Sequence, residues 1–256
     1  MFKGARPRKR WRYVALFDEQ VMVCAAIVQV GPALQSFWAI HTREDGRMRE
    51  RTRLLPRRGR LELSPGRMAV CDDGVLLDVE LSEDDGIQAL CPHGRQRVWT
   101  RKQAGIAARG RLSLDGGPAR TIDALAVIDD TSGHHARVTE WFWTAGVGRG
   151  PDGIALAWNL VSGVNDPPHG SERAVWVDGE PREVPAVSFA PDLSEIRAED
   201  GSLLSFIAMA ERNRSENLLI LRSDYRAPFG SFHGSLPGGA RLAEGLGVVE
   251  YHCAHW

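Results

Sequence analysis

Short apolar segments follow one another along almost the whole chain, and polar turns separate them. Pairs such as Asp115-Gly116 and Asp178-Gly179 are typical of tight hairpin turns. Almost no segment is long or periodic enough for an amphipathic helix. Residues 208–219 could hold a turn of helix, although their Asn-Arg-Ser run fits a strand followed by a loop equally well. The pattern therefore predicts an all-β protein. Representative segments are VMVCAAIVQV, TIDALAVID, RVTEWFWTA, IALAWNLVSG and GVVEYHC.

So many antiparallel strands must avoid open sheet edges, which favours a closed meander. We expect one lipocalin-like β-barrel or two barrel-like halves. The strands IALAWNLV and VMVCAAIV are apolar on both faces, as in a barrel wall that another part of the protein covers. The glycine-rich segment LDGGP suggests a boundary. We predict a basic disordered tail at 1–10, an N-terminal β half at 11–117, and a C-terminal β half at 118–256 that carries the site.

Composition is that of an ordinary globular protein, with 43% hydrophobic and 25% charged residues. The 32 Lys and Arg residues balance 33 Asp and Glu residues, so no global basic field points to a nucleic-acid partner. Two stretches, 3–12 and 47–60, are locally basic. Each could be a solvated tail or loop, or a peripheral contact with an anionic membrane. The four scattered cysteines predict reduced thiols, and without an apolar run that could span a bilayer we expect a cytoplasmic protein.

The stretch from Asp129 to Trp176 holds four of the eight tryptophans and three of the eight histidines, interleaved with polar residues. If 137–144 is extended, Arg137, Thr139, Trp141 and Trp143 share one face. Such an aromatic wall can simply pack the core. Alternatively, it can bind a flat or polyene ligand, or shield a developing carbocation through its π faces.

Acid–base candidates lie in the same stretch. A desolvated carboxylic acid has a raised pKa and can donate a proton, a role that we assign to Asp130 or Glu172. His134 and His135 would relay the proton or position water. The alternatives are a turn cap at Asp130 and a structural salt-bridge network around Glu172. Residues expected to contact the ligand are Arg137, Trp141, Trp143, Asn159, Asn165, Asp166, Arg173 and Trp176.

Other chemistries fit the spacing poorly. His252 and His255 would face opposite ways on a strand, and no second pair has matching spacing, so we predict no metal site. A G-x-S-x-G serine motif is absent. The sequence GVGRG at 146–150 lacks the Gly-Lys-Ser of a phosphate-binding loop and is interpreted as a loop between strands. No cofactor is expected.

Several segments resemble the bacterial family known as domain of unknown function 2804, over roughly Trp11 to Trp256. They are DTSGHHARVTEWFWTAGVG, AWNLVSGVND, SERAVWVDGEP and the C-terminal run from SDYRAPFG to the end. An aspartate followed by a glycine and a W-x-W strand is also similar to the carotenoid 1,2-hydratase, tocopherol cyclase and AttH-like group. That resemblance implies lipocalin-like halves and enzymes that protonate a carbon–carbon double bond of a terpenoid. Its counterparts here are Asp130, Gly133, Trp141 and Trp143.

Together these observations predict an enzyme that acts on a hydrophobic small molecule, terpenoid- or polyketide-like, without a cofactor. The reaction would be hydration or dehydration, isomerisation, or cyclisation. A non-catalytic protein that binds a lipid or another small hydrophobe in the same cavity is the alternative.

Overall fold

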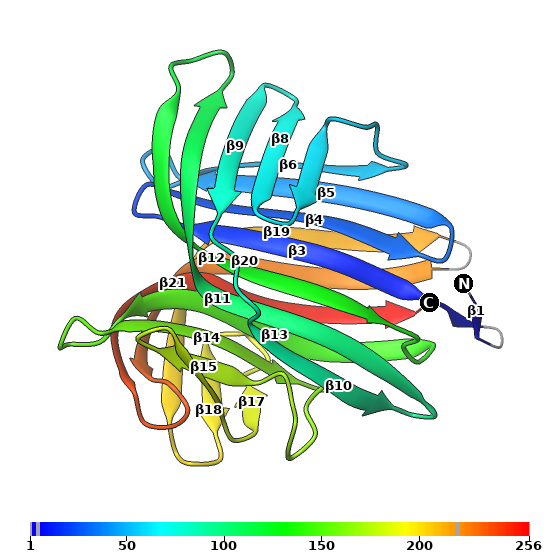
Figure 1. The fold of residues 1–256 in the computed structure, drawn as a ribbon, viewed down its shortest axis with the longest axis vertical. Coiled ribbons are helices and arrows are strands. Elements are labelled where there is room, and N and C mark those ends of the chain that lie inside the picture. Colours follow the sequence, from blue (N-terminus) through cyan, green and yellow to red (C-terminus); the bar gives the residue numbers. More distant parts are fainter. Residues whose placement is uncertain (1, 4–5, 219–220, 256) are drawn as a thin grey trace.

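The computed structural model describes residues 2–3, 6–218 and 221–255, and all regular elements within them are β-strands. They form two large antiparallel sheets and one two-stranded ribbon (Figure 1). The all-β prediction is confirmed. Residues 208–218 lie inside a long strand rather than a helix, and Leu219 lies outside the described residues.

The first sheet has ten strands in the order β6-β5-β4-β3-β12-β11-β9-β8-β7, with β10 also paired to β11. Its strands are β3 (Lys9–Phe17), β4 (Val21–Val30), β5 (Ala33–Thr42), β6 (Arg47–Leu54), β7 (Leu61–Ser64), β8 (Arg67–Asp72), β9 (Val75–Leu81), β10 (Ile87–His93), β11 (Gln96–Leu114) and β12 (Arg120–Gly133).

The second sheet has nine strands in the order β16-β15-β14-β13-β21-β20-β19-β18-β17. They are β13 (Val138–Arg149), β14 (Ala155–Ser162), β15 (Ala174–Val177), β16 (Glu180–Glu183), β17 (Val187–Phe189), β18 (Glu195–Ala198), β19 (Leu203–Leu218), β20 (Leu221–Ser235) and β21 (Arg241–His255).

Both sheets have the same topology. In each, the first four strands run outward to one edge, the chain returns from the other edge, and the last strand pairs with the first: β12 with β3, and β21 with β13. The two halves are therefore built alike, although the sequence shows no visible repeat. Figure 1 shows the long central strands of both sheets crossing the middle of the molecule, with the shorter strands curling away above and below.

Several predicted turns close the hairpins. Asp73-Gly74, Asp115-Gly116 and Asp178-Gly179 all have positive φ angles and join β8 to β9, β11 to β12, and β15 to β16. Two successive positive φ angles characterise the tight turn that matches the twist of antiparallel strands, which is why Asp-Gly pairs recur there.

The passage from one sheet to the other lies at residues 134–137, between β12 and β13. The segment LDGGP, where we expected a boundary at 117/118, is the turn of the β11–β12 hairpin, and both of these strands belong to the first sheet. The expected disordered tail at 1–10 also differs from the structure: Phe2–Lys3 pairs with Arg6–Pro7, and Lys9 begins β3 with its side chain buried.

Three hydrophobic cores result from this arrangement. One fills the curl of the first half and includes Leu16 and Met68, whereas a second fills the curl of the other half around Trp158 and Phe232. The third core lies between the halves and draws residues from both sheets, from Tyr13 to Val248. The site lies within this shared layer.

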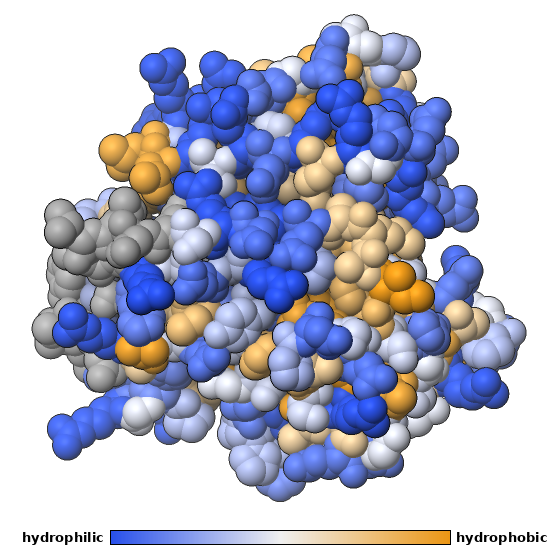
Figure 2. Space-filling model, turned by 180° about the vertical axis from the view of Figure 1, so that it is seen from behind, coloured by the Kyte–Doolittle hydropathy of each residue, from blue (hydrophilic) through white to orange (hydrophobic). Residues whose placement is uncertain are grey.

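The face of the molecule seen in Figure 2 is mostly hydrophilic, with hydrophobic side chains in separate groups. Within the basic stretch 47–60, Arg51 pairs with Asp73, and Arg53 and Arg60 both reach Asp72. These ion pairs neutralise part of the positive charge of the stretch. Leu54 and Leu55, within the same stretch, are exposed, and contact with a membrane there stays a prediction. No helix of the described chain could cross a bilayer.

Candidate functional site

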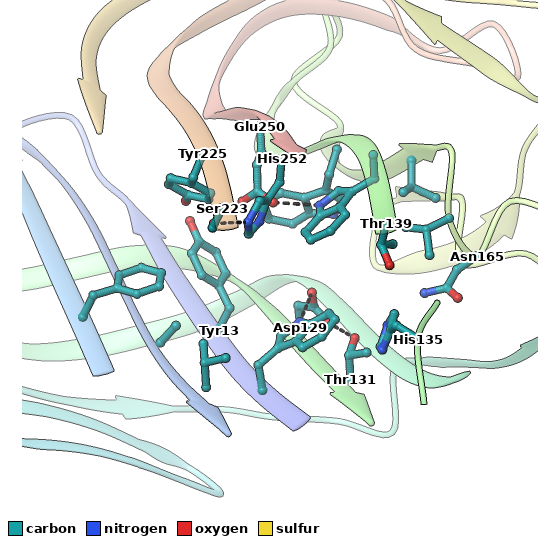
Figure 3. Close-up of a pocket in the computed structure, with 18 of the residues that line it drawn as sticks. Tyr13, Asp129, Thr131, His135, Thr139, Asn165, Ser223, Tyr225, Glu250 and His252 are labelled. Atoms are coloured by element: carbon teal, nitrogen blue, oxygen red, sulfur yellow. Dashed lines mark hydrogen bonds between the residues drawn. The ribbon is translucent and has the colours of Figure 1, made fainter. Parts of the chain in front are cut away.

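A cavity of about 150 Å³ lies between the two sheets (Figure 3). Strands β3, β4, β5, β11 and β12 supply one wall, and β13, β14, β19, β20 and β21 supply the other. Most of the lining surface is apolar, although about half of the lining residues carry a polar or charged group. The residues that matter below are Trp11, Tyr13, Phe37, Lys102, Asp129, Thr131, His135, Thr139, Trp141, Trp143, Asn165, Glu172, Arg212, Ser223, Tyr225, Glu250 and His252.

Strand register decides which acidic residue enters the cavity. Tyr13, Asp129 and Lys102 lie side by side across β3, β12 and β11, and their side chains face the second sheet. Because side chains alternate along a strand, the neighbouring row of Arg12, Asp130 and Arg101 faces the other way. Asp129 therefore lines the cavity, and Asp130 does not.

A buried ionic cluster occupies one part of the cavity. The Lys102 ammonium lies 2.8 Å from Asp129 Oδ1 and 3.2 Å from Glu172 Oε1. Asp129 also accepts hydrogen bonds from Trp11 Nε1 and Thr131 Oγ1, which fixes its orientation. Burial opposes the charge on Lys102, but the two carboxylates raise its pKa overall. Burial raises the pKa of Glu172, which Lys102 partly offsets.

Glu250 is a second buried acid, and no basic side chain forms an ion pair with it among the described residues. Its Oε1 accepts a hydrogen bond of 2.8 Å from Trp141 Nε1. Burial raises the pKa of Glu250 to about 7, and the negative charge of Asp129 adds to that rise, whereas the hydrogen bond from Trp141 and the positive charge of Lys102 oppose it. A carboxylic acid with a pKa near neutrality can both give and take a proton at physiological pH.

His252 and Tyr225 surround Glu250. The His252 ring lies 4.3 Å from the Trp141 ring and 5.3 Å from the Tyr225 ring, centroid to centroid, and its Nε2 lies 2.7 Å from Ser223 Oγ. Burial lowers the pKa of His252 to about 3, and the positive charge of Arg212 lowers it further. His252 is therefore neutral at pH 7. Desolvation also raises the pKa of Tyr225 well above its ordinary value, which keeps its hydroxyl protonated.

His135 and Asn165 line a different part of the cavity, away from Glu250 in Figure 3. The His135 ring packs 5.2 Å from the Trp11 ring, and burial lowers its pKa to about 3. Neither ring nitrogen of His135 has a hydrogen-bond partner within the described part of the chain. Asn165 donates from Nδ2 to Glu172 Oε2 at 3.0 Å, while its Oδ1 is buried without a partner.

Five of the residues expected from the sequence line this cavity: His135, Trp141, Trp143, Asn165 and Glu172. Trp141 and Trp143 share the cavity face with Thr139, as alternation along the strand predicts. Their assigned roles remain predictions.

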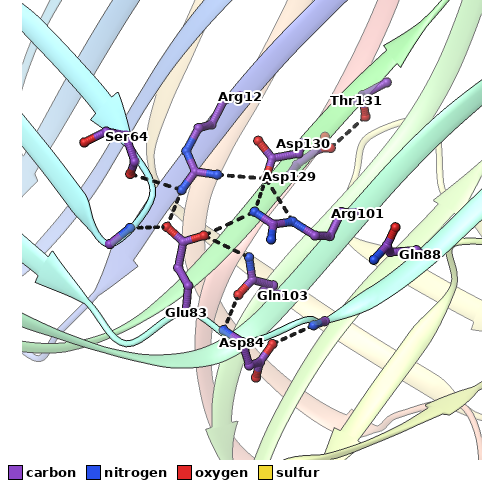
Figure 4. Close-up of polar contacts among 12 residues, drawn as sticks. Arg12, Ser64, Glu83, Asp84, Gln88, Arg101, Gln103, Asp129, Asp130 and Thr131 are labelled. Atoms are coloured by element: carbon purple, nitrogen blue, oxygen red, sulfur yellow. Dashed lines mark hydrogen bonds and ion pairs between the residues drawn. The ribbon is translucent and has the colours of Figure 1, made fainter.

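Asp130 is the main correction. It lies on the opposite face of β12, where its Oδ2 pairs with Arg12 at 2.7 Å and with Arg101 at 2.8 Å (Figure 4). Glu83 joins both of these arginines, and Gln103 donates to Glu83 at 3.2 Å. Because Asp130 is held in this ionic network outside the cavity, we do not retain it as the proton donor.

Three other expected residues are buried but support the cavity rather than line it. Asn159 accepts a hydrogen bond from Trp143 Nε1 at 2.8 Å and donates to the Glu172 carbonyl, so it holds both of these residues in place. Arg173 is almost fully buried and donates to the carbonyls of Asp166 and Pro167, which fixes the loop that carries Asn165. Trp176 packs in the shared core.

The remaining three expected residues lie away from the cavity lining. The Asp166 carboxylate accepts a hydrogen bond from the Gly163 amide at 2.8 Å, so it closes a turn. Arg137 is exposed in the bend before β13, and His134 is half-buried in the connection between the sheets. These placements differ from the expectation that the three residues face a ligand. At His134 and Arg137 the chain turns from one sheet to the other instead of extending as a strand, and Asp166 lies in the loop between β14 and β15.

Sequence reasoning missed residues from the other half of the chain and from its end. Tyr13, Lys102 and Arg212 carry no local signal, because nothing near them in sequence shows that they meet. Glu250 does have a local signal, because it follows Val248 and Val249 in an apolar segment, where a carboxylate is unusual. Across the described ranges, no group of three or more His, Cys, Asp or Glu residues could hold a metal ion.

Comparison with solved structures identifies the fold. An AttH-like protein from Nitrosomonas europaea aligns with a TM-score of 0.62 and 12% identity, over 95% of this chain and 92% of that one. Kievitone hydratase from Nectria haematococca aligns with a TM-score of 0.57 and 12% identity, over 95% and 88% of the two chains. CghA aligns with a TM-score of 0.53 and 10% identity, over 98% and 88%. The fold is therefore lipocalin-like, as expected.

No curated protein matches this chain in sequence. A family model does: residues 68–256 match the model described as Domain of unknown function (DUF2804). The match includes β13, β20 and β21, which form the second wall of the cavity, and the acidic residues Asp129, Glu172 and Glu250. The chain belongs to the DUF2804 family.

Proposed function

We propose that this protein is an enzyme that acts on a hydrophobic small molecule by acid–base chemistry without a cofactor. The reaction would be hydration or dehydration, isomerisation, or cyclisation of a terpenoid- or polyketide-like substrate. The observation that carries this proposal is Glu250, a buried acid with a pKa of about 7 in a cavity walled by Trp141, Trp143 and Tyr13.

In the proposed mechanism Glu250 donates its proton to a carbon of a substrate double bond. The resulting carbocation is shielded by the π faces of Trp141 and Trp143, which interact favourably with cations. Water can then add to the cation and return a proton to the Glu250 carboxylate, which gives hydration. Loss of a neighbouring proton to the Glu250 carboxylate instead gives an isomer. Attack by a second double bond gives a ring and a new carbocation, which becomes neutral by losing a proton to the same carboxylate.

Asp129 and Lys102 have a supporting role in this proposal. Their ion pair, together with Glu172, places fixed charges at the cavity wall, and such preoriented groups stabilise charge without having to reorganise during the reaction. Trp141 has two functions, because its indole N–H also holds the Glu250 carboxyl in one orientation.

The test is turnover in deuterium oxide. Purified protein is incubated with a panel of hydrophobic alkenes and enones, and the products are examined by mass spectrometry for added water and carbon-bound deuterium. For any substrate that is converted, Glu250→Gln should lower the rate by about 10²–10⁴-fold, the usual contribution of a general acid.

Two matched variants make this test specific. Glu244→Gln changes an exposed acid on the same strand and should leave the rate unchanged. Asp130→Asn breaks the network on the outer face and should cost about 1–3 kcal/mol of stability, since it removes one partner of buried charges, while turnover persists. Full activity in Glu250→Gln, or loss of turnover in folded Asp130→Asn, would refute the assignment of Glu250.

A protein that carries a lipid or another hydrophobe is the second candidate. It is supported by the ionic cluster, in which Asp129 and Glu172 both have Lys102 as a partner and so have no need of a substrate. Native mass spectrometry separates the two. A retained and unmodified lipid, with no conversion of any compound in the panel, would favour carriage.

A further inference from the structure

Among the described residues, five buried polar atoms of uncharged side chains that lack hydrogen-bond partners line the cavity, and they form two separate groups. The hydroxyls of Tyr13 and Tyr225 make up the first group, beside Glu250. The second consists of both ring nitrogens of His135 and the Oδ1 atom of Asn165. Figure 3 shows the two tyrosines on one side of the cavity and His135 and Asn165 on the other.

These atoms are well shielded, since each of the four residues is less than one-tenth exposed. Leaving a buried polar group without a hydrogen bond typically costs about 1–3 kcal/mol, so native proteins rarely do so without a functional reason. Elsewhere along the cavity the polar groups pair with one another, as Asp129 does with Trp11, Thr131 and Lys102. The two groups therefore stand out as positions that a ligand would satisfy.

We infer that the ligand of this cavity is a neutral hydrophobic molecule with a carbonyl or hydroxyl oxygen at the Tyr13–Tyr225 end and a hydroxyl group at the His135–Asn165 end. This inference rests on the proposed function for its choice of the reactive end. It goes further by specifying the chemical class of the substrate and its orientation.

The tyrosine end provides donors. Both phenols stay protonated at neutral pH, because burial raises the pKa of Tyr13 and of Tyr225 well above the ordinary value. Two O–H groups can donate to the lone pairs of one oxygen atom, as they would to a carbonyl. A carbonyl held there lies beside Glu250, and hydrogen bonds to it would polarise a conjugated double bond towards addition of water. The Glu250 carboxylate would accept the proton that the water loses and then donate it to the carbon next to the carbonyl.

The other end requires a group that both donates and accepts. Neutral His135 has one nitrogen that donates and one that accepts, and Asn165 Oδ1 only accepts. A hydroxyl can accept from the His135 N–H and donate its proton to Asn165 Oδ1, whereas a ketone could use only the donor. A carboxylate is disfavoured, because it has no proton to donate and would face the buried Glu172, whose side chain accepts a hydrogen bond from Asn165. The two nearby cations are already engaged: Lys102 is shared by two carboxylates, and Lys9 donates to a main-chain carbonyl.

The space between the two ends is apolar and aromatic. Trp11 packs against the His135 ring at 5.2 Å between centroids, and Trp143 packs edge-on against the Tyr13 ring at 5.5 Å. Arg212 lies over the Phe37 ring at 3.9 Å and is paired with Glu50, so it already has a charged partner. This middle section favours a flat or aromatic skeleton without a charge.

The test is calorimetric binding of para-hydroxyphenyl ketones whose connecting chain is lengthened one carbon at a time. Each is compared with the phenyl ketone that lacks the hydroxyl, the alkane that lacks the carbonyl, and the para-carboxy compound. At the best length, we expect the hydroxyl to tighten binding by about tenfold, the equivalent of one or two net hydrogen bonds, and the carboxylate to abolish it.

Variants locate each end. His135→Phe keeps an aromatic ring but removes both nitrogens. In this variant the hydroxyphenyl ketone and the plain phenyl ketone should bind with about equal affinity. Tyr225→Phe should weaken both ketones by a similar factor, about three- to tenfold, and leave the hydroxyl advantage intact. Tyr251→Phe, whose hydroxyl bonds to Glu140 on the exposed face, is the control and should bind as the wild type does.

A hydroxyl advantage that is absent at every chain length, or one that survives in His135→Phe, would overturn the inference. Equal binding of the carboxylate would do the same. Binding does not depend on turnover, so the two proposals fail separately. If Glu250→Gln keeps the binding pattern and no compound is ever converted, the proposed enzyme activity is refuted, whereas the inference about the ligand is supported.

Discussion

At the scale of single residues, the environment of Glu250 decides what the cavity can do. Burial disfavours the charged carboxylate, and no lysine or arginine pairs with it among the described side chains, in contrast to Glu172 and Asp129, which share Lys102. Acids with such different surroundings in one cavity are suited to different roles, one to proton transfer and the others to fixed charge.

This difference predicts a pH dependence of activity. If protonated Glu250 is the acid, the rate should be highest below about pH 7 and fall roughly tenfold per unit above it, because the protonated fraction falls in that way. The rate profile of the wild type checks this. The residual rate of Glu250→Gln should not show this decrease above pH 7. A wild-type rate that is constant up to about pH 9 would argue against Glu250 as the acid.

The same pKa predicts a trend in stability. In the folded state the pKa of Glu250 is about 7, against 4.5 for an ordinary glutamate. Between these values the folded protein binds more protons than the unfolded chain, so the contribution of Glu250 is fully present below about pH 4.5 and is lost as pH rises to about 7.

The free energy of unfolding of the wild type, relative to Glu250→Gln, should therefore fall across that interval by up to about 3 kcal/mol and be constant above it. Urea unfolding at a series of pH values measures this difference. A difference that grows with rising pH would mean that the folded protein favours the carboxylate, and would contradict the environment described for Glu250.

At the scale of elements, close packing of strands positions the aromatic wall. We expected a loop at 146–150, but residues 146–149 continue β13. The glycines there allow tight contact: a Cβ atom on Gly146 would lie 2.3 Å from Trp158 Cζ2 and 2.6 Å from the Leu246 carbonyl oxygen. Glycine in this strand therefore serves packing rather than a turn.

Gly146→Ala should consequently destabilise the protein by about 1–3 kcal/mol, the usual cost of overpacking a core. Thermal unfolding gives the size of the effect. Trp158→Phe, which removes the contacting ring atoms, should cost less in the Gly146→Ala background than in the wild type. Strictly additive effects of the two substitutions would show that the contact with Trp158 is not responsible.

At the scale of the whole molecule, the shared core joins the two halves. Each half has its own inner core, but the layer around Tyr13, Trp143, Tyr225 and Val248 is complete only when both are present. The cavity lies in that layer, so neither half contains the site alone.

We therefore expect a single cooperative unfolding transition in urea. Tryptophan fluorescence reports on both halves, through Trp38 in the first and Trp158 in the second, and it should follow the same curve as circular dichroism. Two separated transitions would show that the halves fold independently and that the shared core contributes little to stability.

The sequence by itself determined the all-β class, many of the hairpin turns and the aromatic strand at the site, because these depend on local patterns: alternation, Asp-Gly turns and apolar runs. It also placed Glu172 and His135 in a stretch that does line the cavity. Asp129 and Asp130 could not be told apart, since a shift of one residue in register reverses the face of every side chain.

Only the tertiary structure decided which face of β12 meets the second sheet, and which distant residues complete the cavity. Tyr13, Lys102, Glu250 and His252 come together through the pairing of first and last strands in each half. The pKa of Glu250 likewise depends on burial between two sheets that are far apart in sequence. Long-range pairing and desolvation leave little trace in a local pattern, so Glu250 became a candidate proton donor only in the folded protein.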